Sequence, residues 1–225
     1  HDFSYPLAHI ITAKYWHNIH NGSLHLTLAD TGWGKAVWGK FYGQMLAGGA
    51  VFIYDYEGAF KPADLLKVMQ DNHVTSFCAP PTIYRFLIRE DISAYDLSAL
   101  EYCTTAGEAL NPSVFTEWKE KTGIMIYESY GQTETTLVVG SFPWITPKPG
   151  AMGVRTPQYD IDILNDEGKP AKPMEHGELV IKVSEKRPLG LFKGYYRDDD
   201  LTAERIKDGY YYTGDIVYRD EDNYL

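Results

Sequence analysis

The chain has 225 residues, of which 44% are hydrophobic, enough for one large domain or two subdomains with their own cores. Its formal net charge of −10 at pH 7 excludes a surface built to neutralise nucleic-acid phosphates, because such surfaces depend on clustered Lys and Arg. The sequence has no long apolar run and no basic leader, so we expect neither a membrane span nor a secretory signal.

The first part of the chain has the pattern of a sheet covered by helices. Short apolar runs predict strands at residues 24–28, 50–54, 74–79, 99–104 and 124–127. Residues 62–71 and 82–89 repeat apolar positions on one helical face. A third helix is bracketed by Asn111 as N-cap, Pro112 at the first helical position and Gly123 just past the last turn.

After about residue 149 the pattern changes to hairpin-like alternation. We expect strands at residues 160–164, 178–183 and 210–218, with a turn at 166–168. The Pro- and Gly-rich stretch 146–156 is the expected boundary between two subdomains. The predicted fold class is therefore α/β, with a mixed, largely parallel sheet and flanking helices in residues 1–148 and a smaller, mostly β subdomain in residues 149–225.

The cysteines and histidines show no metal-binding pattern. Cys78 and Cys103 each lie in an expected buried strand, without a Cys-x-x-Cys motif, so we expect no structural metal and a reducing compartment, the cytoplasm. Four histidines crowd residues 9–25 at spacings that fit no standard ligand motif, and we assign them no role.

The most informative segment is residues 127–135, which follow an expected strand and break at Gly131. Loops at the carboxyl ends of strands bind ligands in open α/β sheets. Thr133 offers a hydroxyl to a phosphate oxygen, Glu134 offers a carboxylate suited to Mg²⁺, and Tyr130 offers a flat face for a nucleobase. A solvated polar loop is the plainer interpretation.

Two further segments have the chemistry to complete a ligand site. Residues 104–110 follow another strand, and Gly107 allows the backbone to approach a planar ligand closely. Asp215 follows Gly214, and a carboxylate there can accept two hydrogen bonds from a vicinal diol. An ordinary strand-to-helix loop and a turn aspartate are the alternatives. If the strands are parallel, the loops at 104–110 and 127–135 emerge at the same sheet edge.

These three segments, with residues 177–179 and 194–195 between them, resemble in order and spacing the adenylate-forming (AMP-binding) superfamily of acyl-CoA synthetases, luciferases and peptide-synthetase adenylation domains. The resemblance covers essentially the whole chain. Residues 30–35, Asp-Thr-Gly-Trp-Gly-Lys, are most similar to the medium-chain and branched-chain acyl-CoA synthetases.

The resemblance implies a role for each of these segments. Thr133 would contact the α-phosphate and Glu134 would ligate Mg²⁺, as the catalytic residues. Tyr130 would stack on adenine, and Asp215 would hold both ribose hydroxyls. The residues implied to bind ATP or AMP are Gly107, Glu108, Ala109, Glu128, Ser129, Tyr130, Gly131, Gln132, Thr133 and Asp215.

The resemblance also implies a reaction and a substrate class. A carboxylate attacks the α-phosphorus of ATP to give acyl-AMP, and coenzyme A then displaces AMP. Acetyl-specific relatives carry Trp at the position of Gly131, so glycine implies an open pocket floor and an acid longer than acetate, in fatty acid metabolism. Trp33, Val37 and Trp38 are the candidate walls. Plain core packing is nearly as good an interpretation of Val37 and Trp38.

The family's phosphate-binding loop and mobile C-terminal domain have no counterpart in these residues, so we expect the isolated chain to bind AMP or ATP weakly and to turn over nothing. Two other functions stay open. An adenylation domain would load an amino or aryl acid onto a carrier protein, with Asp30 as a candidate partner for an ammonium group. A non-catalytic interaction module would use the acidic, tyrosine-rich surface. The sequence predicts small-molecule partners and does not address oligomeric state.

Overall fold

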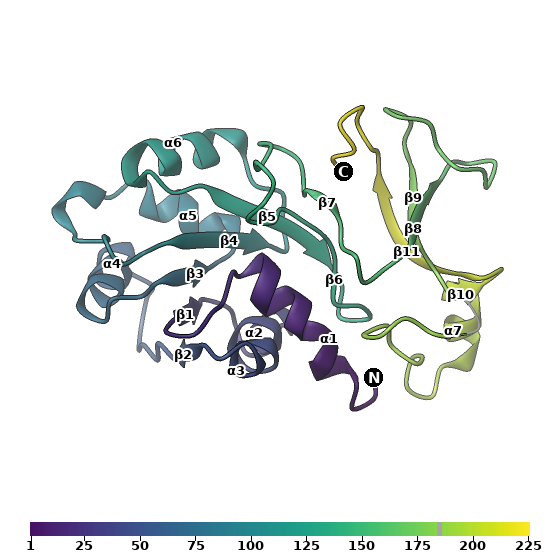
Figure 1. Ribbon diagram of the computed structural model, residues 1–225, viewed down its shortest axis with the longest axis horizontal. Helices are drawn as coiled ribbons and strands as arrows, with labels where there is room; N and C mark the ends of the chain where they lie inside the picture. Colours follow the sequence, from purple (N-terminus) through teal and green to yellow (C-terminus); the bar gives the residue numbers. More distant parts are fainter. Residues whose placement is uncertain (184–185) are drawn as a thin grey trace.

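The computed structural model describes residues 1–183 and 186–225, which form two sheets side by side (Figure 1). The larger sheet has the strand order β2-β1-β3-β4-β5-β6-β7, and the smaller one has the order β10-β11-β9-β8. β1 to β5 pair in parallel, β6 pairs antiparallel with β5, and β7 pairs antiparallel with β6. The smaller sheet is antiparallel. The predicted fold class is thus confirmed.

The strands of the larger sheet are β1 (Leu24–Thr27), β2 (Ala50–Phe52), β3 (Ser76–Cys78), β4 (Tyr102–Ala106), β5 (Ile126–Gly131), β6 (Leu137–Gly140) and β7 (Val154–Arg155). The strands of the smaller sheet are β8 (Ile161–Leu164), β9 (Gly177–Lys182), β10 (Ile206–Lys207) and β11 (Tyr210–Val217).

Helices cover both faces of the larger sheet (Figure 1). On one face lie α4 (Pro62–Asp71), α5 (Pro81–Leu87) and α6 (Pro112–Thr122), each opened by a proline, which lacks the N–H that a first turn would leave unpaired. Because successive strand residues point to opposite faces, Phe77 packs with Trp118 under these helices. Its neighbour Cys78 packs with Trp16 on the other face.

That other face is covered by α1 (Tyr5–Ile11), the π-helical turn η1 (Thr12–Trp16), α2 (Gly34–Lys40) and α3 (Gly43–Leu46). A short 3₁₀ turn, η2 (Ile92–Ala94), precedes β4, and α7 (Asp199–Arg205) precedes β10. The sequence pattern predicts none of the six elements α1, η1, α2, α3, η2 and α7. For α7 the sequence does contain an N-cap residue, Asp198. Its carboxylate caps the helix by accepting a hydrogen bond from the backbone N–H of Leu201 at 3.0 Å.

The expected strands and helices are all present; α4 has the predicted bounds, and most of the others have shifted ends. β4 begins at Tyr102 rather than at residue 99, because Asp96 builds a turn by accepting from the N–H of Ser98. The caps of α6 are confirmed: Asn111 accepts from the N–H of Ser113 at 2.9 Å, and Gly123 has a φ of +75°. β5 starts only after this left-handed turn and extends to Gly131.

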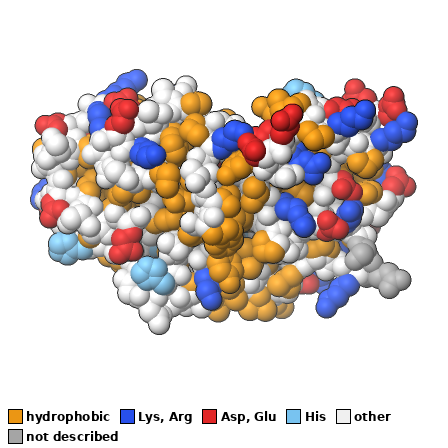
Figure 2. Space-filling model, turned by 45° about the horizontal axis from the view of Figure 1, so that its top comes forward, with side chains coloured by type: hydrophobic (Ala, Val, Ile, Leu, Met, Phe, Trp, Pro, Cys, Tyr) orange, Lys and Arg blue, Asp and Glu red, His pale blue; other side chains and the backbone are white. Residues whose placement is uncertain are grey.

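The two sheets share a core at β6, which lies next to the edge strand β7 of the larger sheet. Val138 and Val139 of β6 pack with Leu179, Ile181 and Tyr211 of the smaller sheet. Figure 2 shows hydrophobic side chains gathered in a band across the middle of one face, with most charged side chains to either side. This shared core holds β11 beside the end of β5. The subdomain boundary between residues 148 and 149 stays a prediction.

Candidate functional site

The ends of β4 and β5 bring two predicted ligand-binding segments together. Their parallel pairing runs from Cys103 opposite Ile126 to Ala106 opposite Ser129. The loops that follow, from Gly107 after β4 and from Gln132 after β5, therefore leave the sheet at the same edge. The sequence-based expectation of a common edge is confirmed for these two loops.

A cavity of about 320 Å³ lies at this edge. It is lined by residues from both sheets, including all the residues predicted to bind nucleotide except Thr133. The lining residues are Gly107, Glu108, Ala109, Glu128, Ser129, Tyr130, Gly131, Gln132, Met152 and Asp215. Met152 is the lining residue that the sequence reasoning missed, since an isolated Met in a Pro- and Gly-rich stretch carries no recognisable signal.

Asp215 of β11 is held at the cavity by two donors. Its Oδ2 accepts hydrogen bonds from the hydroxyl of Tyr130 at 2.5 Å and from Nε2 of Gln132 at 2.8 Å. Gln132 is fixed in turn, because its Oε1 accepts from the hydroxyl of Tyr211 at 2.7 Å. Both donors to Asp215 use Oδ2, so among the described residues Oδ1 remains for a ligand. This geometry suits a carboxylate that accepts from a diol.

Glu128 and Ser129 place buried polar groups in the cavity wall. The carboxylate of Glu128 accepts from the backbone N–H of Leu110 at 3.1 Å, yet burial raises its pKa to about 7. Near neutral pH it can therefore donate to or accept from a ligand. The buried hydroxyl of Ser129 has no partner among the described residues. An unpaired buried hydroxyl in a cavity wall fits a site that a polar ligand completes.

Thr133 and Glu134 lie beyond the cavity, in the loop between β5 and β6. The carbonyl of Thr133 accepts from the hydroxyl of Tyr5 at 3.2 Å. The carboxylate of Glu134 accepts from the hydroxyl of Tyr195 at 2.9 Å. Among the described residues no group of three or more His, Cys, Asp or Glu side chains could hold a metal ion, so Glu134 would bind one with at most one other such side chain. This donor set fits Mg²⁺, which is often held by one or two carboxylates plus substrate phosphates.

A second cavity of about 360 Å³ adjoins the first at Gly107 and Glu108. Its lining is Ala29, Asp30, Trp33, Lys35, Pro80, Thr82, Ile83, Ala106, Gly107 and Glu108. Of the residues predicted to form the acyl pocket, only Trp33 lines it. Trp33 is 62% exposed.

The open pocket floor expected at Gly131 is not present. A Cβ at Gly131 would lie 2.7 Å from Cη2 of Trp38 and 2.3 Å from the carbonyl oxygen of Thr136. Trp38 is buried, and Val37 is half-buried outside the second cavity. This close packing explains the glycine at position 131. The resemblance to acetyl-specific relatives predicts empty space there instead.

Lys35 is a second residue that the sequence reasoning missed. Its side chain is buried in the wall of the second cavity, where Nζ donates to the carbonyl of Ala106. Burial lowers its pKa, and the Glu108 carboxylate opposes that shift. A lysine within a Gly-rich polar stretch gave no signal of burial.

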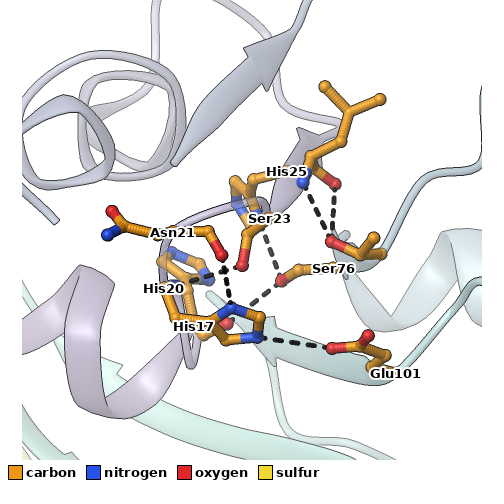
Figure 3. Close-up of polar contacts among 9 residues, drawn as sticks. His17, His20, Asn21, Ser23, His25, Ser76 and Glu101 are labelled. Atoms are coloured by element: carbon orange, nitrogen blue, oxygen red, sulfur yellow. Dashed lines mark hydrogen bonds and ion pairs between the residues drawn. The ribbon is translucent and has the colours of Figure 1, made fainter. Parts of the chain in front are cut away.

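Three histidines, at the end of η1 and in or just before β1, make polar contacts with residues in or next to neighbouring strands: His17, His20 and His25 (Figure 3). His25 is bonded through Nδ1 to Ser76 and through Nε2 to Thr27, at 2.9 and 2.7 Å. Ser76 also donates to the carbonyl of His17. Burial lowers the pKa of His25 to about 3, so this ring is neutral at pH 7. His20 differs, because it is exposed and lies 3.4 Å from the carboxylate of Glu101.

Comparison with known proteins agrees with this arrangement. The profile of a family described as AMP-binding enzyme matches residues 6–196. 4-Hydroxybutyrate–CoA ligase 1 of Metallosphaera sedula is 44% identical over 223 residues, covering 99% of this chain and 39% of that protein. The mitochondrial acyl-coenzyme A synthetase ACSM3 of Homo sapiens is 35% identical over 222 residues, covering 99% of this chain and 38% of that protein.

Solved structures share the fold. The crystal structure of the Brucella canis acyl-CoA synthetase matches with a TM-score of 0.87 and 29% identity, over 98% of this chain and 40% of that chain. The chain thus spans about two fifths of the length of the proteins it matches. Within the described residues no helix is both long and apolar enough to cross a membrane. The family profile covers most of the chain and relatives above 30% identity align with nearly all of it, so the chain belongs to the AMP-binding enzyme family, alongside acyl-CoA synthetases.

Proposed function

We propose that the protein containing this chain is an AMP-forming acid:CoA ligase, and that the chain binds the adenosine part of ATP and the acyl group. The observation that carries this proposal is the cavity shared by Glu128, Ser129 and Tyr130 of β5 with Asp215 of β11. A ring, a diol acceptor and buried polar groups converge there. The fold match to the anthranilate CoA ligase AuaEII, solved in complex with anthranoyl-AMP, supports an acyl adenylate as the ligand, with a TM-score of 0.84 and 25% identity.

In this proposal adenine lies between the loop at Gly107 and the ring of Tyr130, and the ribose hydroxyls donate to Asp215. Thr133 then faces the α-phosphate, and Glu134 would hold Mg²⁺ together with phosphate oxygens. Bound Mg²⁺ would neutralise charge that accumulates on the phosphoryl oxygens. The side chains bind and orient their ligands rather than forming covalent bonds with them.

The reaction then needs no nucleophilic side chain. A carboxylate oxygen of the acid attacks the α-phosphorus, forming the acyl-AMP bond as pyrophosphate leaves. The sulfur of coenzyme A next attacks the acyl carbon, forming the thioester as AMP leaves and the thiol loses its proton.

The acid we propose is a medium-chain or branched one, with its tail in the second cavity against Trp33 and Ile83. The cavity joins the nucleotide site at Gly107, and its volume of about 360 Å³ far exceeds the needs of an acetyl group. Asp30 lines this cavity too, but Lys35 stands in the same wall and would repel an ammonium group. An amino acid is therefore the less favoured substrate.

The test is the release of pyrophosphate from ATP by the intact protein, measured with acids of increasing length. We expect release to depend on the acid, to rise beyond acetate and to be followed by CoA thioester formation. Acetate as the best substrate by a wide margin would contradict the substrate class. Amino-acid-dependent release without CoA consumption would instead indicate an adenylation domain, and no nucleotide binding at all would indicate an interaction module.

A cytoplasmic location stays a prediction. The two described cysteines are buried free thiols, which agrees with a reducing compartment. One relative named above is a mitochondrial protein, and the mitochondrion is an alternative that cell fractionation would distinguish.

A further inference from the structure

The segment 192–195 holds Glu134 at two points. The backbone N–H of Phe192 donates to the carbonyl of Glu134 at 2.6 Å, and the hydroxyl of Tyr195 donates to Oε1 of its carboxylate at 2.9 Å. These contacts join residues 58 or more positions apart in the chain. The main chain and the side chain of Glu134 are thus both fixed by the same segment.

Contacts other than the one with Glu134 also hold Tyr195 in place. Its backbone N–H donates to the hydroxyl of Thr202 at 2.8 Å, and its ring packs edge-on against Phe192 with centroids 4.9 Å apart. Gly194 is required beside it, because a Cβ there would lie 2.9 Å from Cγ2 of Thr202. The Gly-Tyr pair singled out in the sequence therefore forms a rigid support for one hydroxyl.

Such a support restricts the orientation of a carboxylate that is carried on the flexible side chain of a glutamate. The hydrogen bond at Oε1 fixes the plane of the carboxylate and, among the described residues, leaves Oε2 for a cation. Outer hydrogen bonds of this kind orient metal-ligating carboxylates. The hydroxyl of a tyrosine is ordinarily protonated at neutral pH, so that of Tyr195 can donate to this carboxylate.

We propose that Tyr195 is a positioning residue that orients the carboxylate of Glu134 toward a divalent cation carried by the bound nucleotide. This inference rests on the proposed function, and it adds a residue for which neither the sequence pattern nor the nucleotide cavity indicates a role. Tyr195 lies outside that cavity and acts through Glu134 rather than on the substrate.

The adjacent tyrosine offers a matched control. Tyr196 is 86% exposed, and its ring lies under the guanidinium of Arg197, 5.0 Å from the ring centroid. Tyr195→Phe removes the hydroxyl that reaches Glu134 and keeps the ring against Phe192. Tyr196→Phe removes a hydroxyl one residue away that reaches neither Glu134 nor the cavity.

The experiment is a titration of the intact protein, saturated with ATP, with Mn²⁺, following free Mn²⁺ by electron paramagnetic resonance. We expect Tyr195→Phe to weaken Mn²⁺ binding roughly tenfold, the lower end of the effect of removing an outer-shell partner. AMP binding without metal and the melting temperature should stay as in the wild type. Tyr196→Phe should match the wild type in all three measurements.

Glu134→Gln separates failure of this inference from failure of the proposed function. If Glu134→Gln loses Mn²⁺ affinity while Tyr195→Phe keeps it, the positioning role is overturned and the metal site survives. If Glu134→Gln keeps full affinity, the metal assignment fails and the role of Tyr195 fails with it. A weakened Tyr195→Phe with an equally weakened Tyr196→Phe would also overturn the proposal, since the effect would not come from the Glu134 contact.

Discussion

Glu128 shows how the position of one residue in the fold sets its chemistry. It is 6% exposed, in the middle of β5, and it faces the nucleotide cavity with a pKa raised to about 7 by burial. The N–H of Leu110 partly offsets that shift by stabilising the charged form. A sequence pattern can place a glutamate near a ligand, but only the packed structure reveals that it stays partly protonated.

Glu128 should make stability fall as pH rises. Its folded pKa lies above the unfolded value of 4.5, so its contribution is complete below pH 4.5 and is lost as pH rises through about 7. Glu128→Gln removes this loss and should gain at most about 3 kcal/mol relative to wild type at pH 8, at about 1.4 kcal/mol per pKa unit. Urea denaturation at pH 4 and pH 8 measures the difference. Glu108→Gln, an exposed neighbour in the same cavity, is the control, and equal gains in the two variants would contradict this account.

Tyr5 of α1 links Trp38 of α2 to Thr133, in the loop between β5 and β6. Its hydroxyl accepts from Nε1 of Trp38 at 3.0 Å and donates to the carbonyl of Thr133. Tyr5→Phe leaves both of these groups without that partner and should lower the free energy of unfolding by about 1 to 2 kcal/mol. Chemical denaturation checks this value. Tyr42→Phe, whose ring packs against Tyr5, is the matched control and should have a smaller effect.

At the scale of elements, the sequence predicted those that carry local signals. α6 was bounded correctly because Asn111, Pro112 and Gly123 mark its ends by their own chemistry. The parallel strands were found from apolar runs between amphipathic stretches. Motif order predicts the nucleotide-binding residues after β4, in and after β5, and in β11, and the structure places all of them except Thr133 at one cavity.

Other elements depend on contacts distant in sequence, which no local pattern reveals. α2 has no capping side chain, and its burial depends on packing against β1 and α3. Trp38 and Gly131 are 93 positions apart, so no local pattern indicates that the Trp38 ring fills the space beside the glycine. The burial of Lys35 was missed for the same reason.

The turn from β5 into β6 should therefore tolerate no side chain at Gly131. A Cβ there would clash with the Thr136 carbonyl, so Gly131→Ala should destabilise the protein by about 2 kcal/mol or more. Gly140→Ala, on the paired strand, meets side-chain atoms only at 3.4 Å or more and should change stability by less than about 1 kcal/mol. Thermal and urea unfolding of both variants tests the contrast, and equal stabilities would show that the packing is looser than described.

At the scale of the whole molecule, three buried histidines make the stability of the fold sensitive to acid. Burial lowers the pKa of His9 and His25 to about 3 and lowers that of His17 well below its ordinary value. Their contribution is complete above the unfolded pKa of 6.5 and is lost as pH falls toward their folded values. Stability should fall between pH 6.5 and 4 with a slope of at most about 4 kcal/mol per pH unit, for three protons.

Urea denaturation between pH 7 and pH 4 measures this slope. His20→Asn should leave it unchanged, because His20 is exposed beside Glu101. His25→Asn should reduce it, since one buried proton acceptor is removed. A stability that stays constant from pH 7 to pH 5 would contradict the burial of these rings.

The two sheets meet so that β5 of one and β11 of the other line a single cavity, and we propose that AMP binds at this junction. Calorimetric titration with AMP tests it most directly, with Asp215→Ala compared with Asp160→Ala, an exposed aspartate of the same half of the chain. We predict that Asp215→Ala weakens AMP binding at least about tenfold, since a charged acceptor of ribose hydroxyls is lost, while Asp160→Ala binds as the wild type does. Equal AMP affinity in both variants would contradict the account.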